Sequence, residues 1–321
     1  MHLESKRNSN KKCSKDRNNK SDVEPEMVQP HQRLVQNLQK LSKRLHREDH
    51  RRIRSKQKLL RRKQAKELNL PKQIPKTIES TRKPNDDSVH PSDEETKIEE
   101  SLDEFSNYFD KKIVPKILIT TSHNPHRKTV KFCRELRNTI TNSELRWRRK
   151  AHIKKIIPSA IERNFTDLLI INEDRGQPNG LLHVHLPNGP TANYRLSSIK
   201  YQSDIKNKAA FNNSCPEVII NNMTTRLGYS IGRMLSSLFH FEPQFRGRKV
   251  ITFHNQRDYI FFRQHLYEFK NESKVAIKEL GPRFTLKLRS LQHGTFDSKF
   301  GEYEWIEHRH EQGVDRRKFA L

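Results

Sequence analysis

The sequence carries the same short pattern twice, about a hundred residues apart. Residues 115–121 read Pro-Lys-Ile-Leu-Ile-Thr-Thr and residues 216–222 read Pro-Glu-Val-Ile-Ile-Asn-Asn. Each run is typical of a short buried strand that ends in polar residues, and each precedes a segment with helical spacing. Aligning Pro115 with Pro216 superposes both strands and both helix starts. The repeat predicts an internal duplication, and hence a mixed α/β fold of two similar halves.

A helix is predicted after each of these strands. Asn124 and Pro125 are typical of a helix start, with asparagine at the N-cap and proline in the first turn. The core-facing positions of the two helices recur at helical spacing: they are Val130, Cys133, Leu136 and Ile140 in the first, and Leu227, Ile231, Met234 and Leu238 in the second.

Aliphatic runs bounded by turn residues predict the remaining strands. They cover 168–171, 181–186 and 192–196 in the first half, and 249–253, 274–279, 284–291 and 303–307 in the second. Between two of these strands, Asn255 and Asp258 form an N-cap pattern. The apolar residues that follow predict a helix with Tyr259, Phe262, Leu266 and Phe269 on one face.

The first 110 residues have a different composition. Residues 31–67 hold 14 basic and 3 acidic residues, whereas residues 85–110 hold 10 acidic and 1 basic. Charge without apolar content predicts a largely disordered tail over residues 1–111. Leu34, Leu38, Leu41 and Leu45 share one helical face, so we expect a basic helix within 31–67. That helix either orders on a partner or stays a solvated, partly helical tail.

Prolines and the near absence of apolar residues between Pro71 and Pro91 indicate a linker. We interpret the acidic block at 85–110 as a solvated spacer. The alternative is that it shields the basic regions from wrong partners.

Charge narrows the class of partner. The formal net charge of +26 and the pI of about 10.1 favour a protein that sits on a polyanion. The three cysteines lie far apart, which excludes a disulfide framework or a four-cysteine zinc site and favours a reducing compartment. No apolar run approaches the ~20 residues needed to span a bilayer, so no membrane partner is expected. Arg61, Arg62 and Lys63 form a weak signal for nuclear import.

Nothing in the sequence assembles an active site, a cofactor loop or a metal centre, so we expect no enzyme, no cofactor and no metal. His183 and His185 alternate on one strand face, but a tetrahedral site needs further ligands that this spacing does not supply. An RNA-modifying or RNA-cleaving enzyme would need a carboxylate cluster, for which Asp167, Glu173 and Asp174 are the candidates.

Cations cluster around aromatic residues at three places. They surround Trp147, adjoin Phe245 and interleave with Phe284. Lysine and arginine fix a phosphate chain, and an exposed aromatic ring stacks on an unpaired base. Taken singly, each of the three aromatic residues is better explained by core packing. Leu286 and Leu288 alternate with polar neighbours, so that strand buries one face and offers the other to RNA.

Several segments together resemble the Brix domain family. They are Leu-Ile-Thr-Thr-Ser at 118–122 with its basic helix, the run 216–223, and Gly-Tyr-Ser-Ile-Gly-Arg at 228–233. Two longer segments, 247–258 and 279–288, complete the match. It covers residues 112–310, with halves at 112–205 and 214–310 and a basic tail at 311–321. The basic N-terminal region, the segment 121–129 and the abrupt basic end suit the large-subunit branch of this family.

The resemblance implies an α/β domain whose halves are each like an anticodon-binding domain. It implies a ribosome assembly factor for the large (60S) subunit that acts in the nucleolus. The implied partners are pre-ribosomal RNA, other assembly factors and a small protein bound to the Brix domain. It also implies an RNA-binding motif from Gly281 to about Glu311, and it brings no catalytic residues.

These arguments give a set of candidate RNA-binding residues. They are Arg127, Lys128, Arg146, Arg148, Arg149, Lys150, Arg226, Arg233, Arg246, Arg248, Lys249, Arg283, Lys287, Arg289, His293, Lys299 and Arg309. The main alternative is a protein-interaction scaffold within pre-ribosomal particles, with the segment 31–67 as its working part. A DNA-binding regulator is a weaker alternative, because charge alone does not distinguish DNA from RNA.

Overall fold

The computed structural model describes residues 30–67, 75–83, 87–90, 93–206, 213–272, 274–297, 299–307 and 319–321. The chain divides into two units, Met1–Pro75 and Lys76–Leu321. The first contains helix α1 (Pro30–Glu67), a single helix of 38 residues over the segment where a basic helix is predicted. Leu38, Leu41 and Leu45 lie on it, each more than half exposed.

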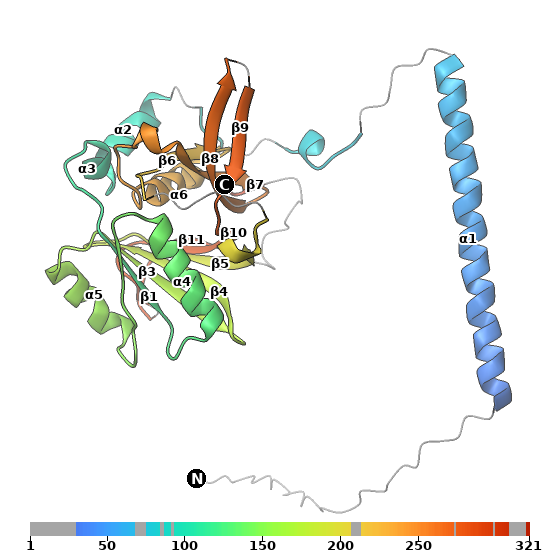
Figure 1. The fold of residues 1–321 in the computed structure, drawn as a ribbon, viewed down its shortest axis with the longest axis horizontal. Helices are drawn as coiled ribbons and strands as arrows, with labels where there is room; N and C mark the ends of the chain where they lie inside the picture. The colour runs from blue at the N-terminus through green and yellow to red at the C-terminus, as the bar shows by residue number, and fades with distance from the viewer. Residues whose placement is uncertain are drawn as a thin grey trace, which may run out of the picture. The chain divides into compact units, whose positions relative to one another are not determined.

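The second unit, called the body below, is a mixed α/β structure (Figure 1). Its helices are α2 (Glu94–Leu102), α3 (Ser106–Phe109), α4 (Arg127–Thr139), α5 (Ile153–Glu162) and α6 (Arg226–Ser236), with 3-10 turns η1 (Glu79–Thr81), η2 (Gln202–Asp204) and η3 (Phe245–Gly247). Its strands are β1 (Ile117–Thr121), β2 (Ser143–Leu145), β3 (Asp167–Asp174), β4 (Gln177–His185), β5 (Thr191–Lys200), β6 (Glu217–Asn221), β7 (Lys249–Gln256), β8 (Tyr259–Asn271), β9 (Lys274–Glu279), β10 (Arg283–Gln292) and β11 (Tyr303–Ile306).

One sheet runs through the body in the order β2-β1-β3-β4-β5-β10-β8-β7-β6, with β11 beside β10 and β9 beside β8. In the first half β1 is parallel to β3, and β3, β4 and β5 are antiparallel neighbours. In the second half β6 is parallel to β7, and β7, β8 and β10 are antiparallel neighbours. The two halves therefore repeat one plan, which confirms the predicted mixed α/β fold. They meet where β5 pairs with β10, with Leu196 opposite Leu286.

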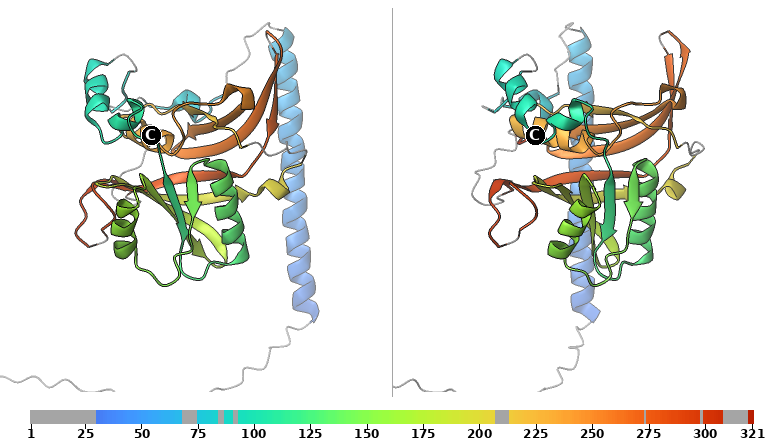
Figure 2. Two further views of the ribbon diagram at one scale, coloured as in Figure 1. Left: turned by 60° about the vertical axis from the view of Figure 1, so that its left-hand side comes forward. Right: turned by 90° about the vertical axis from the view of Figure 1, so that its left-hand side faces the viewer.

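Side chains alternate between the two faces of the sheet along each strand, and the two faces pack against different helices. Ile117 and Ile119 of β1 join Phe132 and Leu136 of α4 in the main core. Leu118, between them, points the other way into a second cluster with residues of α5. In the second half, α6 packs on one face of the sheet through residues that join the same main core. Figure 2 shows α4 and α5 on either side of the first half's strands.

The expected strands are present, but the helix expected over Tyr259–Phe269 is wrong. That segment is β8, paired with β7 from Gln256 opposite Tyr259 onward. Arg257 and Asp258 both have positive φ, 57° and 62°, which is the conformation of a two-residue hairpin turn of type I′. The period-2 burial of Ile260 and Phe262 then outweighs the helical spacing of the same segment.

The predicted start of α4 is also displaced. The helix begins at Arg127, and Asn124 takes a left-handed conformation with φ 45°. The Glu173 carboxylate of β3 accepts a hydrogen bond from the backbone N–H of His126 at 2.9 Å. An acidic side chain from a neighbouring strand thus caps this helix, which the local sequence does not reveal.

The acidic block is not the spacer that its composition indicates. Residues 94–110 form α2 and α3, and Phe105 between them is buried in the main core. The hydroxyl of Tyr108 donates to the carbonyl oxygens of Ser236 and Phe239 at 3.0 and 2.7 Å, and burial raises its pKa to about 12. The domain boundary expected at residue 111 stays a prediction, but residues before it already belong to the body.

Part of the expected linker also belongs to the body and forms hydrogen bonds within it. Arg82 donates to the hydroxyl of Thr224 at 3.2 Å, and the N–H of Val89 donates to the Thr224 carbonyl at 2.9 Å. At the other end, Leu321 is buried and its N–H donates to Asp258 at 3.0 Å. Residues 311–318 of the expected basic tail lie outside the described residues. Across the described residues, no helix has the length and apolar content to cross a bilayer.

Candidate nucleic-acid interface

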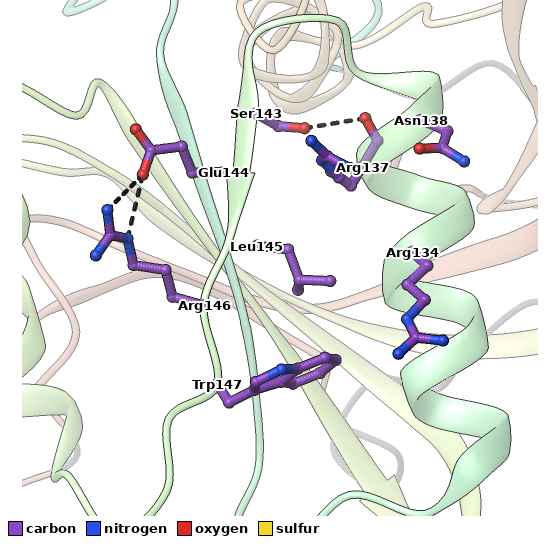
Figure 3. Close-up of a pocket in the computed structure, with 8 residues that line it drawn as sticks. All are labelled: Arg134, Arg137, Asn138, Ser143, Glu144, Leu145, Arg146 and Trp147. Atoms are coloured by element: carbon purple, nitrogen blue, oxygen red, sulfur yellow. Dashed lines mark hydrogen bonds and ion pairs between the residues drawn. The ribbon is translucent and has the colours of Figure 1, made fainter.

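An open basic surface lies along the edge strand β2. A hollow of about 750 Å³ is bounded by β2 on one side and α4 on the other. In Figure 3, Leu145 and Trp147 point toward α4, whereas Glu144 and Arg146 point away from it. Arg134 and Arg137 project from α4 into the same hollow (Figure 3). The hollow thus places an aromatic ring on one wall opposite two guanidinium groups on the other.

Two further hollows extend this surface. One lies beside Arg127, Lys131 and Arg134 near the start of α4. The other runs from Trp147 over α5, past Lys155 and Arg163. Arg134 joins the first hollow to the second, and Trp147 joins it to the third. The three hollows therefore form one continuous strip, which we name the β2 surface.

Most cations of the β2 surface have no acidic partner. Among the described residues, no ion pair involves its cations Arg127, Lys131, Arg134, Arg137, Arg148, Lys155 or Arg163. The exception is Arg146, whose Nη2 lies 2.8 Å from Glu144. Glu144 has a lowered pKa because Arg146 donates to it and because Lys116 and Arg163 lie nearby. A strip of unneutralised cations attracts a polyanion and positions its phosphates.

Of the three aromatic residues expected in the core, one is buried and two are exposed. Trp147 is 42% exposed and lies on the β2 surface, so its assignment to the core is wrong. Phe245 is also exposed, because it sits in the 3-10 turn η3 outside the sheet. Phe284 is buried and stacks on Phe262 with ring centroids 4.4 Å apart, as expected for a core residue.

The predicted residues of the second half are mostly engaged within the chain. Lys249 is 1% exposed, so it is corrected from an RNA contact to a buried residue; burial lowers its pKa to about 8. Its Nζ donates to the Ser214 carbonyl at 3.5 Å. Lys287 and Arg289 both pair with Glu307 of the adjoining strand end, so the polar face of β10 is neutralised rather than open.

Four arginines of this half are also engaged with acidic side chains. Arg248 pairs with Glu268 at 3.5 Å, and Arg283 pairs with Glu279 at 3.3 Å. Arg226 and Arg233 pair with α2 and the residue that follows it. Arg246, His293 and Lys299 are exposed, whereas Arg309 lies outside the described residues. Of the candidates, Arg127, Arg146 and Arg148 therefore line the β2 surface, whereas Lys128, Arg149 and Lys150 adjoin them in the sequence without lining its hollows. Most candidates of the second half are paired or buried.

Several residues of the β2 surface are absent from the candidate set. Arg134, Arg137, Lys155 and Arg163 belong to it. The signal for Arg134 and Arg137 was present, since they lie off the apolar stripe of a predicted helix. The strand β2 and the helix α5 were not predicted, so nothing in the sequence placed these helices around Trp147.

A buried polar cluster lies at the start of β3. Asp167 Oδ1 accepts from His183 Nε2 at 3.0 Å and from His185 Nδ1 at 2.8 Å. Burial favours the neutral acid, but these hydrogen bonds hold the pKa of Asp167 well below its ordinary value. Burial likewise opposes the charge on His185, yet the bond to Asp167 raises its pKa. The two histidines thus share one strand face, as expected, and hold a carboxylate.

Two of the three carboxylates considered for an enzyme, Asp167 and Glu173, have structural roles. Asp167 is inaccessible in its histidine cluster, and Glu173 caps α4. The pKa of Glu173 lies below its ordinary value because hydrogen bonds from Thr129 and His126 outweigh its burial. Within the described part of the chain, no three histidine, cysteine or acidic side chains gather in a way that would hold a metal ion.

Comparison with known proteins identifies the family. The Brix domain model matches residues 121–290, more than half of the chain. The chain belongs to the Brix domain family. Over 252 residues, 78% of this chain and 72% of the relative, it is 57% identical to "Ribosome production factor 1" of Pongo abelii. It is 51% identical over 273 residues to "Probable ribosome production factor 1" of Drosophila melanogaster, covering 83% of this chain and 69% of that one.

Solved structures also match. The crystal structure of a probable ribosomal biogenesis protein from Aeropyrum pernix K1 aligns with a TM-score of 0.42 and 13% identity. It covers 54% of this chain and 96% of that one. An archaeal Imp4-like protein aligns with a TM-score of 0.34 and 14% identity, over 56% of this chain and 99% of that one.

Proposed function

We propose that this Brix domain protein is a ribosome biogenesis factor that binds precursor RNA of the large ribosomal subunit through the β2 surface. The role in ribosome biogenesis is supported by the family and by relatives that bear the name ribosome production factor. The RNA contact is supported by one observation above others: cations of the β2 surface without acidic partners flank an exposed Trp147.

The proposed mechanism is binding without chemistry. Arginine and lysine side chains neutralise phosphates and release counterions, and Trp147 stacks on an unpaired base beside them. The hollow between β2 and α4 is open to solvent, so it suits a single strand or a splayed loop better than a buried small ligand. Such a protein holds one RNA conformation while other factors join. Action in the nucleolus belongs to this proposal.

The test is crosslinking of the protein to RNA in cells, followed by sequencing of the crosslinked RNA. Reads concentrated on a discrete part of the large-subunit rRNA precursor are expected. The double variant Arg134→Ala/Arg137→Ala should lose most of them. Lys270→Ala/Lys278→Ala is the matched control, because both lysines are exposed in the second half, away from the β2 surface. Equal loss in both variants, or reads scattered over messenger RNA, would reject the proposal.

A protein-interaction scaffold is the second candidate, favoured by the exposed leucines of α1. An amphipathic helix whose apolar side chains are exposed is suited to a partner's groove. Removal of residues 1–75 separates the two functions. If that truncated chain keeps RNA binding and loses association with pre-ribosomal particles, α1 carries the scaffold function and the body carries the RNA.

A further inference from the structure

The helices α4 and α6 hold equivalent positions in the two halves, and their arginines match. α4 has arginine at its first and eighth residues, Arg127 and Arg134, and α6 has arginine at its first and eighth residues, Arg226 and Arg233. The buried positions agree in phase as well, since both helices bury their third, sixth, seventh and tenth residues. The second half therefore carries a copy of an arginine pair that lines the β2 surface.

The two pairs differ in what they face. Arg127 and Arg134 line an open hollow and have no ion pair among the described residues. Arg226 is held by Glu95 and Glu99, with Nη2 and Nη1 each 3.3 Å from a carboxylate oxygen. Arg233 donates to Asp103 Oδ1 at 2.8 Å. Carboxylates of α2 and of Asp103 thus occupy the two arginines of α6. The corresponding arginines of α4 are open to phosphate.

A carboxylate and a phosphate offer the same pattern to a guanidinium group, two oxygens at the spacing of its N–H fork. The acidic segment from Glu94 to Glu104 holds six carboxylates and one lysine, a local charge like that of a short nucleic-acid strand. It is tethered beside α6 by Phe105, which is buried in the main core. Its position is therefore fixed by apolar packing, which keeps its charges beside α6.

The two arginines are held with unequal strength. The side chain of Arg233 is 14% exposed, its Nη2 also donates to the Glu100 carbonyl at 2.7 Å, and its guanidinium lies 4.0 Å from the ring of Phe109. Arg226 is 56% exposed, and its partners Glu95 and Glu99 are exposed as well. Exposed ion pairs are weak and are screened by salt. Arg226 is therefore the one that another anion can take over, while Arg233 keeps the segment in place.

We propose that α2 is an intramolecular competitor for phosphate, which occupies the second half's copy of the arginine pair and confines RNA to the β2 surface. The inference rests on the proposed function, because it assumes that the β2 surface binds RNA. It also defines a second phosphate-binding position, Arg226, which becomes available when α2 is displaced.

The test uses the full chain and a labelled 20-nucleotide oligouridine, with binding followed by fluorescence anisotropy at several salt concentrations. The variant Glu95→Gln/Glu99→Gln frees Arg226 and leaves the Asp103–Arg233 pair intact. It should bind several-fold more tightly, and its log–log salt slope should steepen by about 0.7 for each additional phosphate that the protein neutralises on single-stranded RNA. Adding Arg226→Ala should cancel the gain.

The matched control is Glu272→Gln/Glu302→Gln, which removes the same charge from two exposed acidic residues that have no ion pair with a described residue. An equal gain in this control, or a gain that survives Arg226→Ala, reduces the effect to net charge and overturns the inference. No gain at all in Glu95→Gln/Glu99→Gln also overturns it. If the parent chain fails to bind, or if Arg134→Ala/Arg137→Ala binds as well as the parent, the proposed function itself is wrong.

Discussion

The two halves of the body share a plan and use their cations differently. Each half places a parallel strand pair beside two antiparallel strands and carries an arginine-bearing helix after its first strand. In the first half the cations face solvent around Trp147. In the second half carboxylates from α2 and from the ends of strands neutralise Arg226, Arg283 and Lys287. The duplicated halves therefore share the positions of basic residues but not their accessibility to a phosphate. On the proposed function, that accessibility decides which half binds RNA.

The largest effect that distinguishes the halves is expected at the eighth position of the two helices. Arg233→Ala removes charge-assisted hydrogen bonds to Asp103 at a part-buried site, so we expect the free energy of unfolding to fall by about 2 kcal/mol. Arg134→Ala should change it by less than about 0.5 kcal/mol, as for an exposed site. Urea denaturation of both variants measures this. Similar losses of stability at the two sites would contradict the conclusion that Arg233 is engaged within the chain and Arg134 is not.

The aromatic residues give the second contrast. Trp147→Ala should weaken RNA binding by about 1–3 kcal/mol, the usual contribution of one stacked base, with little change in stability because the ring is exposed. Phe245→Ala, on an exposed ring of the second half, should leave RNA binding unchanged. Anisotropy titration with oligouridine measures both. A loss in the Phe245 variant would extend the interface into the second half.

The smallest effects concern pH. Corresponding strands begin with a buried acid in the first half, Asp167, and a buried base in the second, Lys249. His185 has a raised pKa in the folded chain, so its contribution to stability is complete below its unfolded pKa and is lost as pH rises through the folded value. Asp167 has a lowered pKa, so its contribution is present above the unfolded value and is lost in strong acid. Thermal unfolding of Asp167→Asn should show neither dependence.

Lys249 should give a dependence on pH opposite to that of His185. Its pKa falls from the ordinary 10.5 to about 8, so between these values the unfolded chain binds the extra proton and stability rises with pH. Lys249→Met, which removes the charge at similar volume, should flatten the stability curve between about pH 8 and 10.5. Thermal unfolding across this range compares the two proteins. An unchanged curve would mean that the ammonium group is not the source.

The sequence predicted most strands, because aliphatic runs bounded by turn residues have few alternatives. It failed where a local pattern had two solutions. The apolar residues of β8 fit a helix, and only the turn at Arg257 and Asp258 reveals a hairpin. It also failed for the acidic segment, whose composition predicts a solvated spacer. A single residue, Phe105, packs in the main core and anchors that segment.

The sequence predicts that the site is a basic surface beside aromatic residues, but not which of its basic clusters stays free of acidic partners. Charge clusters around Trp147 were visible, but their availability depends on which carboxylates the fold brings to them. Glu307 neutralises two cations of β10 from across a strand pair, and Glu95 reaches Arg226 over 131 positions of sequence. Such long-range pairs leave no trace in local spacing.

The joint between the halves also has a consequence for how the chain is made. β5 ends at Lys200, whereas its neighbour β10 begins only at Arg283. At about 5–20 residues per second, a ribosome needs on the order of ten seconds to synthesise the intervening stretch. During that interval the nascent first half displays β5 as an open edge, which is the kind of surface that pairs with other chains. Chains that stop before residue 283 should therefore aggregate or exchange strands, and the growing protein needs protection for as long as that edge waits for its partner.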